Sequence, residues 1–232
     1  MNNWEMFDKY QIEQIKEGQK AGLDVSLYAD PKYDYGQMHL IRQGLEENLD
    51  ISLYADPKYD FMQMRMIKEG LEFGIDVSLY ADPKYEWEQM AEIGKGLLGN
   101  LDVSIYADQQ YCWRQMEQIR EGLEMNLDVS LYADQQFGWE QMNQIRHGLE
   151  NGIDASIYAD PRYNWEQMQQ IRWGLESDLD VSSYADPRFD ARKMGQMRQE
   201  LEYESDMEPV DEKGKYEPSE IDWGDPQGAE IW

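Results

Sequence analysis

The chain has 232 residues, of which 48 are acidic and 21 are basic, so its formal net charge at pH 7 is −27. This charge disfavours unaided binding to nucleic acid or to anionic membranes, because the general attraction to phosphate groups has the wrong sign. No stretch approaches the ~18–20 apolar residues that a membrane-spanning helix needs, and the single cysteine, Cys112, cannot form an intrachain disulfide. We therefore expect a cytoplasmic protein with basic protein partners and no direct contact with nucleic acid or membrane.

The first 23 residues contain an imperfect copy of a unit that recurs along the chain. Ile15 and Gly18 match Ile41 and Gly44 in helical phase, while the Asp-Pro pair of the later copies is missing. A terminal repeat has one face without a neighbouring repeat, so departures from the common pattern are expected there. We predict an N-terminal cap over residues 1–23.

Residues 24–202 repeat with a period of 26 residues, without insertion or deletion. The triplet Tyr-Ala-Asp begins at Tyr28 and returns at every period, the last time at Tyr184. A strict period of this length indicates one supersecondary unit stacked on itself, so that the chain forms an array. We predict an all-α, αα-repeat solenoid over residues 1–202, built from eight two-helix units of which the first is imperfect.

Each unit is expected to contain two helices, as residues 50–75 illustrate. Asp50 is a suitable N-cap for a short first helix, and Asp56 followed by Pro57 matches the start of a longer second helix. The second helix is expected to end at Gly74, because glycine readily adopts the left-handed conformation found at helix C-termini. Other units carry Gly, Asn or Asp at this place, which are the residue types that tolerate it best.

The second helix has one nearly invariant face and one variable face. Met64, Ile67 and Leu71 fall in a narrow arc at about 100° per residue, and their columns hardly change between copies. The opposite columns change freely, as expected for a surface in contact with water. A glycine inside a helix costs up to ~1 kcal/mol, and we expect the near-invariant one, Gly70 in this unit, to allow close approach of a neighbouring helix.

Two further columns border the predicted buried seam. We expect the cationic column to form ion pairs between neighbouring units. We expect the aromatic column to pack between units, with stacking on bases or sugars as the alternative. The cationic column comprises Arg42, Lys68, Arg120, Arg146, Arg172 and Arg198, and the aromatic column comprises Tyr35, Phe61, Trp87, Trp113, Trp139 and Trp165.

Residues 203–232 lack the repeat and are rich in acidic residues, proline and glycine. From residue 200 to the last residue, the chain contains 12 acidic residues and two lysines. This composition is typical of a segment that is poorly ordered in isolation, so we predict an acidic tail. Trp223 and Trp232 are candidate anchors of the tail on a partner or on the array, although we favour a solvating tail without a docking role.

The unit consensus resembles a group of bacterial repeat sequences. The pattern Gly-Leu-Glu-x-Gly-Ile-Asp-Val-Ser-x-Tyr-Ala-Asp-Pro-x-Tyr-x-Trp-x-Gln-Met-x-x-Ile, found at residues 70–93, resembles short tandem repeats in proteins of Firmicutes and their mobile elements. The resemblance covers roughly residues 21–201. It implies a bacterial, phage or plasmid setting, and it implies no catalytic residue.

No combination of residues indicates catalysis or a cofactor. The nearly invariant carboxylates are those of the Asp50 and Asp56 columns, and helix capping accounts for them. His39 and His147 lie far apart in variable columns, and no Cys/His spacing fits a zinc site. We predict a protein that is not an enzyme and uses no cofactor or metal, with a hydrolase or metalloenzyme as the least favoured alternative.

Two features are predicted to bind a partner. The first is an apolar patch on the expected solvated face, for which chance drift or self-association is an equal explanation. The second is an acidic line along one edge, which at ~8–10 Å per unit would extend ~70–80 Å and could imitate a nucleic-acid backbone. The patch comprises Leu40, Met62, Met66 and Phe73, and the line comprises Glu46, Glu72, Glu124, Glu150 and Glu176.

These features favour a non-enzymatic, acidic protein-binding solenoid. Its concrete form is a phage or mobile-element inhibitor of a host nucleic-acid-targeting defence protein, acting by steric or DNA-mimic blockade. A general scaffold or adaptor for protein–protein interactions is the alternative. The identity of the partner and the oligomeric state stay open at this point.

Overall fold

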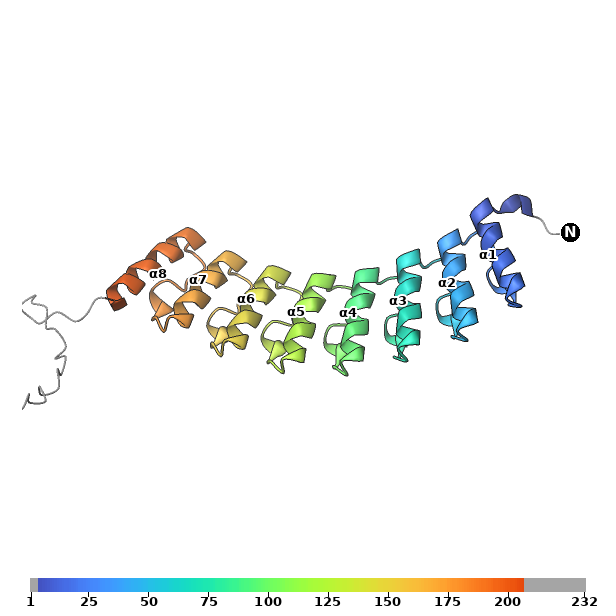
Figure 1. Ribbon diagram of the computed structural model, residues 1–232. Coiled ribbons are helices and arrows are strands. Elements are labelled where there is room, and N and C mark those ends of the chain that lie inside the picture. Colours follow the sequence, from blue (N-terminus) through green and yellow to red (C-terminus); the bar gives the residue numbers. More distant parts are fainter. Residues whose placement is uncertain (1–3, 207–232) are drawn as a thin grey trace, which may run out of the picture.

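The computed structural model describes residues 4–206, and every regular element in this range is helical. Eight α-helices stand side by side in one row in chain order, with α1 at one end and α8 at the other (Figure 1). Each α-helix packs mainly against the preceding and the following α-helix. This arrangement confirms the predicted α-helical repeat solenoid. The α-helices are α1 (Lys9–Lys20), α2 (Tyr35–Glu46), α3 (Phe61–Glu72), α4 (Trp87–Leu98), α5 (Trp113–Glu124), α6 (Trp139–Glu150), α7 (Trp165–Glu176) and α8 (Ala191–Asp206).

A 3₁₀ helix of three residues precedes each α-helix, so the first helix of each predicted pair is a single turn. Asp50 caps the turn η3, as predicted. Its carboxylate accepts hydrogen bonds from the backbone N–H of Ser52 at 3.1 Å and from the Ser52 hydroxyl at 2.6 Å. The 3₁₀ helices are η1 (Trp4–Met6), η2 (Val25–Leu27), η3 (Ile51–Leu53), η4 (Val77–Leu79), η5 (Val103–Ile105), η6 (Val129–Leu131), η7 (Ala155–Ile157) and η8 (Val181–Ser183).

The start of the second helix differs from the prediction. Asp56 and Pro57 belong to a turn, in which the carbonyl of Asp56 accepts a hydrogen bond from the N–H of Tyr59 at 3.0 Å. The α3 N-cap is Asp60. Its carboxylate accepts from the N–H of Gln63 at 2.8 Å, while the Gln63 side chain accepts from the N–H of Asp60 at 2.8 Å. Proline suits the second position of a turn as well as the first turn of a helix, so the Asp-Pro pair did not locate the helix start.

The predicted helix ending is confirmed. Gly74 follows α3 with a φ of 70°, and the N–H of Ile75 donates a hydrogen bond to the carbonyl of Gly70 at 3.1 Å. This is the hydrogen bond of a Schellman ending, and it turns the chain toward the next 3₁₀ helix. The same left-handed backbone conformation occurs at Gly22, Asn48, Asn100, Asn126, Gly152 and Asp178.

The tyrosine of each Tyr-Ala-Asp triplet is buried against the preceding α-helix. Tyr80 is 1% exposed, and its hydroxyl donates a hydrogen bond to the carbonyl of Met66 in α3 at 3.3 Å. A Cβ added to Gly70 would lie 2.0 Å from this hydroxyl. The glycine column therefore makes room for a tyrosine ring, and the prediction that it admits a neighbouring helix is wrong. The pairs are Gly18–Tyr28, Gly44–Tyr54, Gly70–Tyr80, Gly96–Tyr106, Gly122–Tyr132, Gly148–Tyr158 and Gly174–Tyr184.

Two side-chain hydrogen bonds join most units to the next one, and the bond from the tyrosine is missing where Phe137 replaces that tyrosine. The Tyr59 hydroxyl donates to the carbonyl of Ala81 at 2.7 Å, and the Gln63 side-chain amide donates to the carbonyl of Tyr85 at 2.7 Å. Because Gln63 also completes the capping box of α3, one side chain fixes both the helix start and the distance to the following unit.

The ends of the array follow from the same contacts. Glu200 and Lys193 in α8 replace the glycine and the glutamine of earlier units, and within residues 4–206 no further unit follows α8 to use these positions. The helix α8 continues to Asp206, so the predicted boundary between the repeats and the tail at residue 203 lies inside it. Trp223 and Trp232 lie outside the described residues. Within residues 4–206, no helix has the length and apolar character needed to cross a membrane.

The glycine–tyrosine contact predicts opposite effects for two substitutions in α4. Gly96→Ala places a Cβ 2.0 Å from the Tyr106 hydroxyl, and it should lower the free energy of unfolding by ~2–4 kcal/mol through overpacking and loss of a hydrogen bond. Gly94→Ala is the matched control, because its nearest neighbour is 3.8 Å away. It should raise stability by ~0.5–1 kcal/mol through helix propensity. Urea unfolding followed by circular dichroism measures both effects.

A double mutant separates this contact from helix propensity. Removing the hydroxyl with Tyr106→Phe takes away the atom nearest to the added Cβ, so Gly96→Ala should cost less in the Tyr106→Phe background than alone. An equal cost in both backgrounds would contradict the proposed close contact.

Buried tyrosines also predict a cooperative alkaline transition. Burial raises the pKa of Tyr28 and Tyr184 to about 12 from the ordinary value of 10.0, and it shifts the pKa of Tyr54, Tyr80 and Tyr106 in the same direction. The folded state keeps these phenols neutral, so the stability they contribute is complete below pH 10 and is lost as the pH rises toward 12. Tyrosinate absorbance from buried rings should increase together with the loss of helical circular dichroism. Ionisation of all tyrosines near pH 10 with the helices intact would refute this prediction.

Candidate protein-binding surfaces

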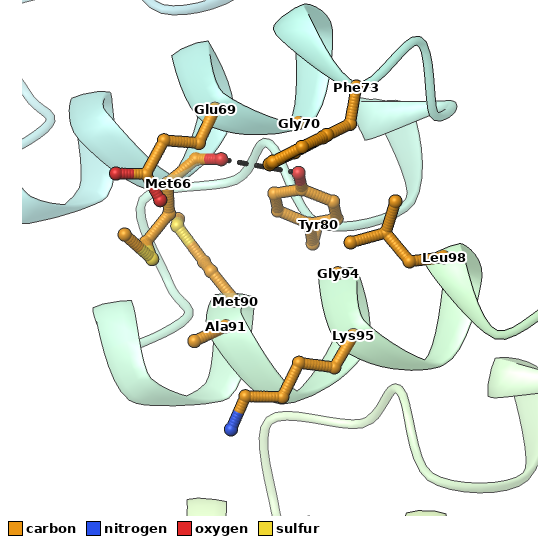
Figure 2. Close-up of a pocket in the computed structure, with 10 residues that line it drawn as sticks. All are labelled: Met66, Glu69, Gly70, Phe73, Tyr80, Met90, Ala91, Gly94, Lys95 and Leu98. Atoms are coloured by element: carbon orange, nitrogen blue, oxygen red, sulfur yellow. Dashed lines mark hydrogen bonds between the residues drawn. The ribbon is translucent and has the colours of Figure 1, made fainter.

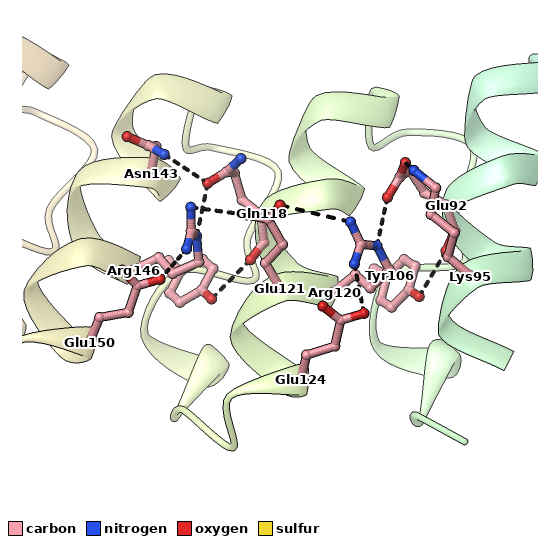
Figure 3. A network of polar contacts seen from close by, with 11 residues as sticks. Glu92, Lys95, Tyr106, Gln118, Arg120, Glu121, Glu124, Asn143, Arg146 and Glu150 are labelled. Atoms are coloured by element: carbon pink, nitrogen blue, oxygen red, sulfur yellow. Dashed lines mark hydrogen bonds and ion pairs between the residues drawn. The ribbon is translucent and has the colours of Figure 1, made fainter. Parts of the chain in front are cut away.

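A ladder of cationic side chains crosses the seams between neighbouring α-helices. Arg146 of α6 donates from Nε to the Gln118 side chain of α5 at 3.0 Å, and its guanidinium pairs with Glu121 of α5 at 3.0 Å (Figure 3). It also pairs with Glu150 in its own helix. The predicted ion pairs between units are confirmed for Arg42, Lys68, Arg120 and Arg146, whereas Arg172 and Arg198 reach the preceding helix through Gln144 and Gln170.

The buried pair of Glu92 and Arg120 shows why these charges are tolerated inside the seam. Glu92 accepts from Nε of Arg120 at 2.7 Å and also pairs with Lys95, and Glu124 binds the other end of the guanidinium at 2.7 Å. Burial opposes the charge of Arg120, but the hydrogen bonds that Arg120 donates to Glu92 and Glu124 outweigh this effect and raise the pKa of the guanidinium. The ladder is thus a compensated internal network.

The predicted acidic line lies on this ladder. Each of its glutamates pairs with the arginine or lysine four residues earlier in the same helix, and a hydrogen bond from Lys68 lowers the pKa of Glu72. The structure therefore places a cation beside every carboxylate of the line, and its role in partner binding stays a prediction. The pairs are Arg42–Glu46, Lys68–Glu72, Arg120–Glu124, Arg146–Glu150 and Arg172–Glu176.

The ladder is interrupted at α4. Gly94 stands where α5 has Arg120, and Leu98 stands where α5 has Glu124. The preceding helix changes too, because Met66 of α3 occupies the acceptor position that Gln118 holds in α5. Donor, acceptor and counterion are therefore all lost at one seam.

Loss of the arginine leaves an apolar groove between α3 and α4. It has a cavity volume of about 150 Å³, and Met66, Tyr80 and Met90 form its walls (Figure 2). In five other units an arginine lies near the equivalent tyrosine, whereas Gly94 supplies no such side chain beside Tyr80, which remains buried and lines the groove. Two side chains at the rim, Phe73 and Leu98, are 67% and 48% exposed.

The predicted apolar patch coincides with this groove only in part. Met66 and Phe73 line it, whereas Met62 is half-buried at the start of α3 and does not. Leu40 is 6% exposed and belongs to the core, so its predicted place on the solvated face is wrong. Each helix in a single row has neighbours on two sides, which makes its exposed arc narrower than the helical wheel indicated. Leu98 lies outside the predicted patch, although the joint loss of Arg and Glu in α4 marks it.

A second surface is a row of aromatic rings along one edge of the array, at the first residue of α2–α7. The prediction that these rings pack between units is correct only in part. Phe61 packs against Gly36, where an added Cβ would meet its ring at 2.9 Å, yet Trp87 and Trp165 are 36% and 41% exposed. We call this the aromatic row: Tyr35, Phe61, Trp87, Trp113, Trp139 and Trp165.

Arg114 of α5 occupies the space between two rings of the aromatic row. Its guanidinium carbon is 5.1 Å from the ring centroid of Trp113 and 4.9 Å from that of Trp139. Both distances are within the range of favourable cation–π contacts. The rings of Trp113 and Trp139 are therefore spaced so that one guanidinium contacts both.

Other side chains of possible chemical interest belong to structural contacts. His39 hydrogen-bonds with Gln14 at 3.2 Å, and His147 contacts Glu150 at 2.8 Å. In the part of the chain that the structure describes, no cluster of three or more His, Cys, Asp or Glu residues could hold a metal ion. Among the described residues, the apolar groove and the aromatic row both present exposed apolar or aromatic side chains at the surface.

Comparisons of the chain with protein-family models, with curated proteins and with solved structures found no match. The case for a function therefore depends on the groove, the aromatic row and the charge of the chain.

Proposed function

We propose that this protein is a non-enzymatic, acidic protein-binding solenoid whose groove between α3 and α4 receives an apolar side chain of a basic partner. The observation that carries the proposal is the interruption of the polar ladder at α4, where Phe73 and Leu98 remain exposed beside a cavity. Burial of each of these side chains by a partner would contribute up to ~1.5–3 kcal/mol.

The size of the groove favours a protein partner over a small molecule. Sites for drug-sized ligands and cofactors usually enclose ~300–1,000 Å³, whereas this cavity holds about 150 Å³. That volume fits one or two apolar side chains. A partner would obtain the rest of its contact area from the surrounding surface, as interfaces with a central apolar anchor do.

The charge of the chain supports a basic partner. A net charge of −27 repels acidic proteins and speeds encounter with basic ones. Glu69 and Lys95 lie at the groove itself, where Glu69 pairs with Arg65 of its own helix at 2.7 Å and Lys95 pairs with Glu92, so the basic preference comes from the charge of the whole chain. We therefore expect a partner segment in which a large apolar residue is flanked by Lys or Arg.

Inhibition of a host nucleic-acid-targeting defence protein, by a phage or mobile element, is a finer form of this proposal. Ion pairing of the predicted acidic line reduces the negative charge that this line presents. Steric blockade through the groove is therefore better supported than imitation of a phosphate backbone by that line. A scaffold or adaptor would use the same groove, and the identity of the captured partner separates the two.

A triple variant fills the groove without changing the net charge. Met66→Gln, Gly94→Arg and Leu98→Glu reproduce at the seam between α3 and α4 the three residues found between α5 and α6. These are Gln118, Arg146 and Glu150. Because this set is native to other units, the variant should fold with unchanged helicity. We expect the wild-type protein to capture a basic partner from bacterial lysate at low salt. The affinity of the variant for this partner should be at least about tenfold lower, which corresponds to a loss of ~1.4 kcal/mol in binding free energy.

Salt dependence completes this test. Raising the ionic strength should weaken capture through screening, but the difference between wild type and triple variant should persist because apolar burial is screened little. Equal capture of every basic protein by the two forms at all salt concentrations would exclude the groove as the binding site.

A further inference from the structure

We propose that the aromatic row holds two arginine side chains of the basic partner, one between Trp87 and Trp113 and one between Trp139 and Trp165. This inference shares with the proposed function the premise that the partner is basic, and it concerns a different surface of the array. The expected partner is a protein segment that contains arginine.

We call the space between two neighbouring rings of the aromatic row a seat. Arg114 of the chain itself occupies one of these seats. Its guanidinium lies between Trp113 and Trp139 at 5.1 and 4.9 Å from the two ring centroids. Arg114 is the second residue of α5, so each unit places one side chain at the corresponding point beside its own ring. The seat between Trp113 and Trp139 is thus already occupied from within.

The seats on either side carry a carboxylate in place of that arginine. Glu88 is the second residue of α4 and Glu140 the second residue of α6. Both are half-buried, and neither forms an ion pair or side-chain hydrogen bond with another described residue. Lys84, which lies in the same hollow as Glu88, is engaged by Asp82 at 3.1 Å. By the repeat position that they share with Arg114, we infer that each of these two seats combines ring faces with an unpaired carboxylate.

Guanidinium is the cation that this combination suits best. It is planar, stacks on aromatic faces, and gives up its hydration more readily than an ammonium group. Its N–H groups can at the same time donate to a carboxylate at the edge of the seat. Lysine offers a compact, strongly hydrated charge that satisfies the carboxylate but gains less from the rings.

The repeat sets the spacing of the two arginines. The seats begin at α4 and α6 and are thus two units apart, which at ~8–10 Å per unit is ~16–20 Å. An extended chain advances ~3.3 Å per residue, so arginines about five or six positions apart would reach both seats.

A peptide titration tests the inference directly. The probe is a Gly/Ser peptide with two arginines six positions apart, and the readout is the chemical shift of the tryptophan indole N–H groups. We expect shifts at Trp87, Trp113, Trp139 and Trp165. Replacing both arginines of the peptide by lysine should weaken binding at least about fivefold. Equal affinity for the two peptides would overturn the proposal.

Protein variants provide the matched control. Glu88→Gln and Glu140→Gln should each weaken binding about threefold to tenfold through loss of one carboxylate. Glu166→Gln is the control, because Glu166 holds the same position in α7 but the next helix begins with Ala191 and offers no second ring. It should leave the affinity unchanged. A loss as large as that of Glu88→Gln would reveal non-specific attraction to negative charge and refute the seats.

The groove variant distinguishes this inference from the proposed function. Met66→Gln/Gly94→Arg/Leu98→Glu leaves the aromatic row intact, so it should bind the arginine peptide like wild type. If the peptide fails to bind while the groove variant still loses partner capture, the inference is wrong and the proposed function stands. If the peptide binds as expected but the groove variant retains full capture, the arginine seats stand and the groove proposal is wrong.

Discussion

The buried tyrosine of each Tyr-Ala-Asp triplet sets the geometry on which the rest of the array depends. Its hydroxyl reaches a backbone carbonyl of the preceding α-helix, as Tyr80 does at Met66, and only a glycine leaves room for it there. The Schellman ending at Gly74 turns the chain so that the tyrosine can enter this space. Insertions between glycine and tyrosine would move the ring out of register, which explains why the spacing between these two residues is constant along the array.

The polar ladder lies over these tyrosines and depends on their position. An arginine such as Arg146 binds an acceptor on the preceding helix and a glutamate on its own helix, so one side chain links three positions. Where the set is complete, the seam is closed and its charges are compensated. Where Gly94 replaces the arginine, the acceptor and the glutamate are also replaced, by Met66 and Leu98. This change removes the polar contacts of one seam and exposes an apolar surface.

Residues whose role is local to one unit were predictable from sequence, and residues whose role depends on a neighbouring unit were not. Asp50 and Gly74 act within a few residues of their own position, so capping rules identified them. The role of Gly70 depends on a ring ten residues later, and Leu40 is buried within a core that several units share. A helical wheel treats a helix as having one buried side, whereas a row of helices buries two. Asp56 was misplaced for another reason, since Asp-Pro is equally compatible with a turn and with a helix start.

The two candidate surfaces constrain the kind of partner that could use both. The aromatic row lies at the first residues of the α-helices, while Phe73 and Leu98 lie at the last turn of α3 and α4 or just beyond it. A helix of 12 residues such as α4 is ~18 Å long, so a short linear segment that follows the row cannot also fill the groove. A partner that engages both surfaces must present its arginines and its apolar anchor from a folded surface or from two separate segments. The energies would then combine through effective concentration, and removal of either surface would weaken binding by more than its own contacts contribute.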